Sequence, residues 1–302
     1  MNPLSTRLRT LPGVASLVLL LALPGSPRSV GEQHDQMHAV LWMQRSAEYK
    51  ACCLQVYNQA SQQLGKALAD RTWTACLEQI DQLAFAKLPP AIIVDVDETV
   101  LDNGGFNARM IRDGGGFQPA AWTKWCEEQQ ATPVPGSLGF LTAARARGIR
   151  VVYLTNRKTG AEEIATRANL LRLGYPLVED AGEDLVLTKG EVGDKSARRR
   201  KVCERYRVVA LVGDNIGDFT VPVKPRKNQG HGEVVEAATT EKMRDACVAE
   251  RADYWGTRWF MLPNPAYGSW ESVLLGQSKD KASLLRTQRL PSKSESPGKD
   301  GR

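Results

Sequence analysis

The chain has 302 residues, of which 42% are hydrophobic and 25% are charged, a composition typical of a folded globular protein. Its formal charge of +6 comes from the two ends, because residues 1–30 carry +3 and residues 276–302 carry +4. The remaining body, residues 31–275, therefore has a charge of −1. This distribution argues against a nucleic-acid polymer as the partner.

Residues 1–29 have the form of a signal peptide. Arg7 and Arg9 precede an apolar run at residues 14–23, and small residues follow it. Ten residues are too few to span a bilayer, which needs roughly 20 residues of helix. We therefore expect cleavage near residues 25–29, no stable membrane insertion afterwards, and a periplasmic or secreted protein. An uncleaved anchor is the alternative.

Residues 30–90 form a predicted helical region that packs on the core. Tyr49, Cys53 and Tyr57 recur at helical spacing, and Trp73 and Cys76 belong to a second pattern of the same kind. We interpret both stripes as core. The six cysteines lack metal-site spacing and are interpreted as buried thiols or as one or two structural disulfides. If the two helices face each other, Cys53 and Cys76 are the first pair to test.

Strands and helices alternate over residues 91–275. Such alternation predicts an α/β fold with a doubly wound, Rossmann-like parallel sheet, in which ligands bind beyond the carboxyl ends of the strands. Small cap elements complete this core, and residues 276–302 are expected to be a disordered basic tail. The expected strands are 91–96, 149–154, 185–187 and 208–212, and the expected helices are 137–148, 160–173 and 194–205.

Two carboxylates lie where the first strand ends. Asp95 and Asp97 project to the same side of extended backbone, so both can address one substrate. Neighbouring carboxylates resist ionising together, which allows one to be an ionised nucleophile and the other a protonated acid. A pair of solvated loop acids would give the same pattern.

Three further motifs follow later strands. Thr155-Asn156-Arg157 offers a hydroxyl and backbone N–H groups to phosphate oxygens, although it could also be a polar turn. Lys195 opens a basic helix and can neutralise phosphate charge, whereas Arg198, Arg199 and Arg200 are interpreted as a solvated face. Asp214 is placed to complete a Mg²⁺ site with Asp95, and Asp218 to bond a metal-bound water or Lys195.

The ordered motifs DVDET, TNR, GDK and GDNIGDF resemble those of the haloacid dehalogenase-like superfamily of phosphotransferases. A closer resemblance is to class C acid phosphatases, the bacterial outer-membrane lipoprotein e family. It spans residues 40–272 and rests on SAEYK at 46–50, DVDETVLDN at 95–103, WTKW at 122–125, TNRK at 155–158 and LPNPAYGSWE at 262–271.

The resemblance implies an aspartyl-phosphate mechanism. Asp95 would attack phosphorus, and Asp97 would protonate the leaving oxygen, which implies an acidic optimum. Thr155 and Lys195 would bind the phosphoryl oxygens. Mg²⁺ would be held by the Asp95 side chain, the Asp97 carbonyl and Asp214. The substrate would contact Asn103, Trp122, Asn156, Arg157 and Tyr267, with the base of a nucleotide between the rings of Trp122 and Tyr267.

The sequence departs from the family at two places. It has no lipid-anchoring cysteine after the apolar run, and Phe106 stands on the leaving-group side where a tyrosine is expected. The leading prediction is an exported acid phosphatase acting on small phosphomonoesters, including 5′-nucleotides. Because relatives form dimers, a homodimer is a possible state of this chain. The alternatives are a specialised phosphatase or phosphotransferase for another monoester, or a binding protein without turnover.

Overall fold

The computed structural model describes residues 34–80, 83–177, 185–220, 237–276 and 280–285. The predicted signal peptide and most of the predicted tail lie outside these residues. Within the described ranges, no helix combines the length and apolar character needed to cross a bilayer.

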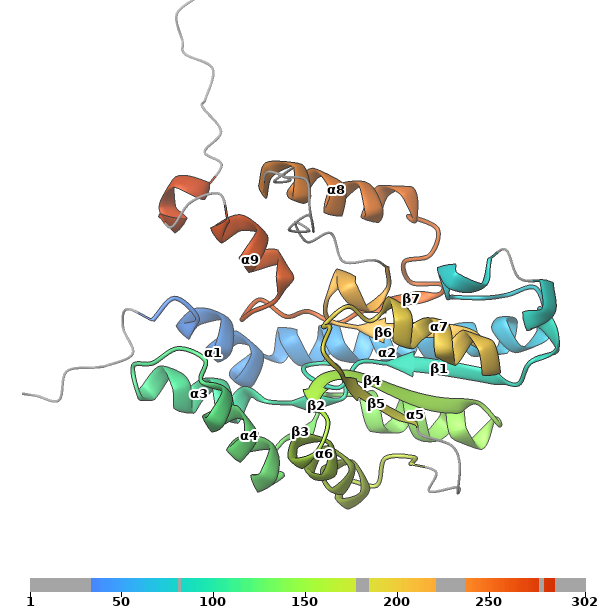
Figure 1. Cartoon of the computed structure of the whole chain (residues 1–302), viewed down its shortest axis with the longest axis horizontal. Helices are drawn as coiled ribbons and strands as arrows, with labels where there is room; N and C mark the ends of the chain where they lie inside the picture. Colours follow the sequence, from blue (N-terminus) through green and yellow to red (C-terminus); the bar gives the residue numbers. More distant parts are fainter. Residues whose placement is uncertain (1–33, 81–82, 178–184, 221–236, 277–279, 286–302) are drawn as a thin grey trace, which may run out of the picture.

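A five-stranded, fully parallel sheet forms the centre of the fold (Figure 1), in the order β5-β4-β1-β6-β7. The predicted α/β doubly wound fold is thereby confirmed. Four strands match the predicted ones within a few residues, whereas β7 is too short to show a periodic pattern. Their bounds are β1 (Pro90–Val94), β4 (Arg150–Lys158), β5 (Val186–Lys189), β6 (Arg207–Gly213) and β7 (Trp259–Met261).

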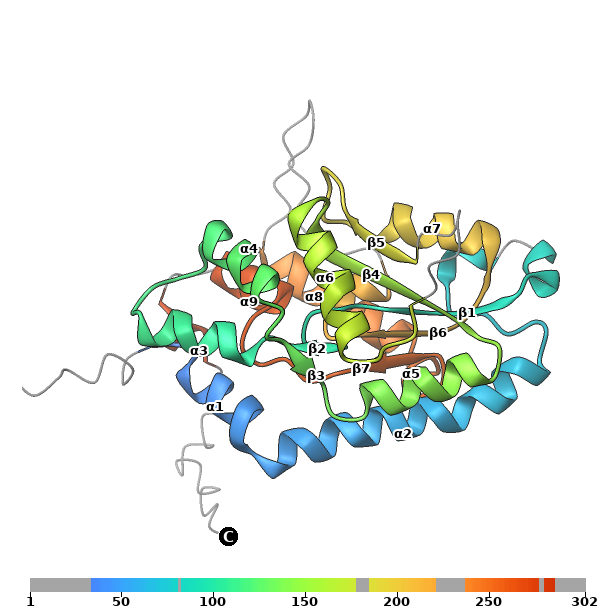
Figure 2. The same ribbon diagram turned by 90° about the horizontal axis from the view of Figure 1, so that it is seen from below.

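Helices cover both faces of the sheet and give it two separate cores (Figure 2). On one face α2 (Ala47–Ala69) and α5 (Ser137–Ala146) pack against Ile92 and Val94. On the other face α7 (Ser196–Arg205) packs against Ala91 and Ile93. This division follows from the alternation of side chains along a strand. The predicted stripe on α2 is buried, as expected for core.

Smaller elements gather beyond the carboxyl ends of the strands. Figures 1 and 2 both place α1 (Met37–Arg45), α3 (Gly104–Arg112) and α4 (Pro119–Glu128) at this end of the molecule. The antiparallel pair β2 (Leu101–Asp102) and β3 (Thr132–Pro133) connects them to the sheet. The remaining helices are α6 (Ala161–Arg172), α8 (Ala237–Glu250) and α9 (Ser269–Leu275).

The predicted second helix of the N-terminal region is wrong. After α2 the chain turns at Asp70, whose carboxylate accepts the Thr72 N–H, and then runs extended along the sheet. The Ala75 N–H donates to Val208 O at 2.7 Å. Pairing with a strand thus replaces the helical hydrogen bonds that the apolar spacing predicted. Among the described residues before β1, two short 3₁₀ turns follow, η1 (Leu77–Gln79) and η2 (Leu83–Lys87).

The condition for pairing Cys53 with Cys76, two helices that face each other, is not met. Cys53 lies in the core under α2, and Cys76 lies in the core under α7, so the sheet separates them. All six cysteines of the chain are free thiols in this structure. The pair depended on two facing helices, and the structure has one helix and an extended segment instead.

Part of the predicted disordered tail is ordered. Residues 280–285 contain the 3₁₀ turn η4 (Lys281–Leu284). Lys281 forms ion pairs with Glu271 at 2.8 Å and with Asp35 at 2.9 Å. This exposed cation therefore connects the end of the fold to α9 and to the residues before α1.

Candidate active site

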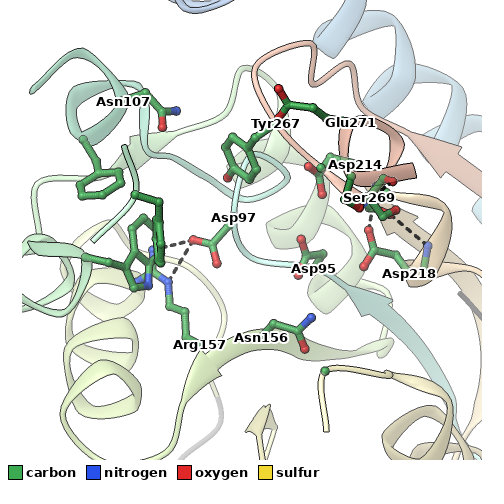
Figure 3. Close-up of a pocket in the computed structure, with 18 of the residues that line it drawn as sticks. Asp95, Asp97, Asn107, Asn156, Arg157, Asp214, Asp218, Tyr267, Ser269 and Glu271 are labelled. Carbon is green, nitrogen blue, oxygen red and sulfur yellow. Dashed lines mark hydrogen bonds and ion pairs between the residues drawn. The ribbon is translucent and has the colours of Figure 1, made fainter. Parts of the chain in front are cut away.

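A cavity of about 580 Å³ lies at the carboxyl ends of β1, β4 and β6. Its wall brings together residues from distant parts of the sequence, as Figure 3 shows. Asp95, Asp214 and Asp218 form one end of the cavity, and aromatic side chains form the other. Asp97 stands between the two ends (Figure 3). This is the edge of the sheet at which the sequence predicted a ligand site.

Lys195 joins two carboxylates at the acidic end. Its ammonium group donates to Asp95 Oδ1 and, at 2.7 Å, to Asp218 Oδ1. Burial works to lower the pKa of Lys195, but the charges of Asp218 and Asp95 more than offset it and raise that pKa above its usual range. Lys195 is therefore a permanent cation beside Asp95. The sequence offered two partners for Asp218, a metal-bound water or Lys195, and the structure shows the contact with Lys195.

The carboxylates exceed the cation in number. One oxygen each from Asp95, Asp214 and Asp218 lies within 4.8 Å of the others. Burial raises the pKa of Asp95 to about 7, against the opposing effect of Lys195, and Asp218 and Asp97 add to the rise. Loss of hydration and the charge of Asp95 raise the pKa of Asp214 well above its usual range. A divalent cation would relieve this repulsion, so the hard oxygen ligands here fit one.

Asp97 is fixed through one of its two oxygens. Oδ1 accepts from Arg157 Nε at 3.0 Å, from Arg157 Nη2 at 2.8 Å and from Asn103 Nδ2 at 2.9 Å. Oδ2 has a longer contact, 3.4 Å, with Thr155 Oγ1. The anchored Oδ1 orients the carboxyl group, and this arrangement leaves Oδ2 as the oxygen that can exchange a proton with a ligand.

Asn103 does not lie where the sequence predicted. We expected it to contact substrate, but it is 1% exposed and lies behind Asp97. Its amide nitrogen donates to Asp97, and its Oδ1 accepts from Trp125 Nε1 at 2.8 Å and from Arg157 Nη2 at 3.2 Å. Asn103 therefore positions Asp97. The motif gave its place in the chain but not the direction of its side chain.

The basic helix is not a solvated face. Arg199 is 1% exposed and donates to Glu78 at 3.0 Å and to Gly217 O at 3.0 Å. Arg198 donates to Asn156 Oδ1 at 2.6 Å and to Thr155 O. Thus only Arg200 is exposed as predicted. The two inward arginines hold the second half of β4 and the loop after β6, which carry the predicted phosphate and metal residues.

Trp122 and Phe106 line the aromatic end of the cavity, and Tyr267 lines its middle, close to Asp97 (Figure 3). Trp122 lies edge-to-face with Phe106 at 5.1 Å and beneath Arg157, whose guanidinium carbon is 5.3 Å from its ring centre. The Tyr267 hydroxyl donates to Glu98 Oε2. Burial, then the charges of Asp97, Asp214 and Asp102, raise the pKa of Glu98 well above its usual range. Trp122 and Tyr267 are thus held by different parts of the site.

A family model described as HAD superfamily, subfamily IIIB (acid phosphatase), matches residues 27–270. The chain belongs to this family. Its members are phosphomonoester hydrolases that act on small substrates and use a divalent metal. The predicted resemblance to class C acid phosphatases is also confirmed by solved structures.

Two of the similar structures are of one class C acid phosphatase, from Bacillus anthracis. The first is 30% identical in sequence with a TM-score of 0.67. The second, with tungstate bound, is 29% identical with a TM-score of 0.66. Each comparison covers 84% of this chain and 98% of the Bacillus chain. The likeness therefore extends over nearly the whole relative.

Sequence reasoning missed several residues on the wall of this acid phosphatase site. Phe117 is 59% exposed at the aromatic end, with its ring 6.2 Å from Trp122. It follows three glycines in a loop before α4, a position without any periodic signal. The other missed side chains come from α1, α3 and α9 and the residues beside them: Gln36, Asn107, Met110, Ser269, Glu271 and Ser272.

We predict that Gly213→Ala inactivates the phosphatase. A Cβ at residue 213 would lie 2.4 Å from Asp218 Oδ2, so Asp218 would have to move away from Lys195. The matched control is Gly65→Ala, on an exposed part of α2 with open space around the new methyl group. We expect this control to raise stability by about 0.5–1 kcal/mol and to keep full activity. Phosphate release and thermal unfolding measure both effects. Full activity of Gly213→Ala would contradict the packing of Asp218 described above.

Proposed function

We propose that this chain is an exported, magnesium-dependent acid phosphatase that hydrolyses phosphomonoesters, including 5′-nucleotides, through an aspartyl-phosphate at Asp95. The main support is the cavity itself, in which a buried carboxylate beside a permanent cation faces an aromatic compartment. The first part suits a phosphoryl group and the second suits a flat leaving group. The Bacillus structure with tungstate bound supports an oxyanion ligand for this kind of fold.

In the proposed reaction Asp95 attacks phosphorus in line and the bond to the leaving oxygen breaks. Lys195 neutralises charge on the phosphoryl oxygens and, by direct contact, opposes the rise in the pKa of Asp95 that burial causes. Thr155, in the second half of β4, donates its hydroxyl to a phosphoryl oxygen. Water then attacks the phosphorus of the acyl phosphate, releasing phosphate and regenerating Asp95.

Asp97 is the proposed general acid and base. Arg157 and Asn103 hold its Oδ1, so Oδ2 can give a proton to the leaving oxygen and later take one from the attacking water. A protonated Asp97 is needed in the first step, and we therefore propose an acidic optimum. A turnover rate that rises steadily up to pH 9 would rule this role out.

The proposed magnesium ligands are the Asp95 side chain, the Asp97 carbonyl oxygen and Asp214. Their oxygen chemistry and their excess negative charge fit Mg²⁺, which takes one or two carboxylates and keeps several waters. When bound, the ion would shield negative charge on the transferring group. Asp214 is oriented for this role by Asn264, whose side-chain amide donates to Asp214 Oδ2 at 2.7 Å.

Export is proposed from the sequence of residues 1–29, which lie outside the described structure. The basic start, the short apolar run and the small residues after it favour cleavage by a signal peptidase. The mature protein would then work in the periplasm or outside the cell.

The first prediction concerns the nucleophile. Asp95→Asn should lower phosphate release from 5′-AMP by roughly 10³-fold to 10⁶-fold, because an amide cannot form the acyl phosphate. The parent should lose activity in EDTA and regain it with Mg²⁺, and acid quenching should trap radioactive phosphate on residue 95. Asp253→Asn, an exposed acid far along the chain, is the control and should remain fully active. A folded parent without activity on any monoester would favour the binding-protein alternative.

The second prediction concerns pH and the metal. The folded-state pKa of Asp95, about 7, lies above the value of about 3.9 for an unfolded chain. Between these values the folded state binds more protons, so metal-free stability should fall as pH rises through this window. Added Mg²⁺ should raise the melting temperature more at pH 8 than at pH 5. Equal shifts at the two pH values, or a shift that survives in Asp214→Asn, would argue against this metal site.

The third prediction concerns the leaving group. Removing a stacking ring costs about 1–3 kcal/mol per base. Trp122→Ala and Tyr267→Ala should therefore lower kcat/KM for 5′-AMP by roughly 5-fold to 150-fold more than for glycerol phosphate. Tyr267→Phe keeps the ring but removes the hydrogen bond to Glu98, and it should retain the preference for 5′-AMP. An unchanged ratio in both alanine variants would favour a specialised, non-nucleotide substrate.

A further inference from the structure

Two buried cysteines meet on the face of the sheet that α7 covers. Cys76 is at the end of the extended segment before η1, and Cys203 is in the last turns of α7. They are 0% and 1% exposed, and both belong to the same core. The Gln79 side chain fixes the segment to the helix, because its amide donates to Cys203 O at 3.0 Å and to Tyr206 O at 2.7 Å.

The two cysteines are neighbours in this core. The Cys76 thiol donates to Glu78 Oε2 at 3.0 Å, and the nearby Cys203 thiol contributes to the raised pKa of Cys76. Gln79 touches both residues, because its backbone N–H donates to Cys76 O at 3.0 Å while its side chain donates to Cys203 O. Cys53, the partner expected from the sequence, is on the opposite face of the sheet. The two sulfur atoms are thus brought together by the packing of η1 on α7.

We propose that Cys76 and Cys203 form a structural disulfide in the mature, exported protein. Two S–H bonds break and one S–S bond forms. Two protons and two electrons pass to a disulfide oxidant, such as oxidised glutathione or a disulfide oxidoreductase, which is reduced to two thiols. This inference depends on the proposed export in one respect: an oxidising compartment outside the cytosol would supply the oxidant.

The surroundings determine when the bond forms. Burial raises the pKa of Cys76 well above its usual range, and Cys203 and Glu78 add to the rise. The thiolate is the reactive species in disulfide exchange, so a folded, reduced chain should oxidise slowly. The bond therefore forms while the chain folds, before the two side chains are enclosed.

The disulfide would stabilise the catalytic helix. Lys195 is at the start of α7, and Arg199 on the same helix bonds to Glu78 and to Gly217 O. A covalent link from residue 76 to residue 203 would prevent α7 from leaving the segment before η1. A disulfide that closes so long a loop also constrains the unfolded chain strongly.

Peptide mapping tests the bond directly. The full chain is unfolded in guanidinium and refolded either in a glutathione redox buffer or in dithiothreitol, and free thiols are then blocked by alkylation. Trypsin should release residues 72–87 joined to residues 202–205 from the oxidised sample only. Alkylated Cys76 and Cys203 in the oxidised sample, or Cys76 joined to another cysteine, would overturn the proposal.

Thermal unfolding tests its consequence. The melting temperature of the parent should be roughly 5–15 °C higher after oxidation than after reduction. Cys76→Ala and Cys203→Ala should abolish this difference, whatever each substitution does to stability by itself. Cys53→Ala, a buried thiol on the other face, should retain it. An equal difference in all four proteins would overturn the assignment. Neither peptide mapping nor thermal unfolding requires catalytic turnover. Their results therefore test the disulfide whether or not phosphatase activity is found.

Discussion

The active-site end of this fold depends on one buried cation between two carboxylates. Lys195 binds Asp95 and Asp218, which follow β1 and β6, while Lys195 itself begins α7. A carboxylate pair buried without a cation would be strongly unfavourable, and so would a buried ammonium group alone. The ion-pair cluster therefore requires these three elements to meet at one point. The proposed reaction uses the same point, because Asp95 is its proposed nucleophile and Lys195 opposes the rise in the pKa of Asp95 that burial causes.

The sequence predicted the parts of the fold that repeat a simple pattern. Buried parallel strands appear as short apolar runs, and the polar motifs that follow them meet because parallel strands end at one edge. The sequence-based prediction failed where the same residue pattern is compatible with two different environments. The spacing of Trp73 and Cys76 is helical, yet the segment pairs with β6. Arg198 and Arg199 look like surface charge, yet both are drawn inward by carbonyl and carboxylate groups that only the folded chain supplies.

The aromatic compartment was harder to predict than the acidic end. Acidic motifs occupy fixed positions after strands, whereas Phe117 comes from a loop and Met110 from the side of α3. Neither position carries a periodic signal, and only the docking of α3 and α4 beyond the sheet brings both to one cavity. Family resemblance supplied Trp122 and Tyr267, and it did not supply the direction of Asn103. Contacts between secondary-structure elements, rather than motifs, therefore decide the shape of the leaving-group side.

Arg157 contacts two parts of the site that have different proposed roles, the acid and the aromatic wall. One edge of its guanidinium holds Asp97, and its face lies over Trp122. A change of Trp122, the ring proposed to stack on the leaving group, would therefore also disturb Arg157, which orients the proposed acid Asp97. If these roles hold, a substitution at Trp122 that changes substrate range should also change turnover, and an engineered change of specificity there would need a compensating change near Arg157. Laboratory evolution toward new monoesters should accordingly find paired substitutions there, or else alter Tyr267, which has no contact with that guanidinium among the interactions described.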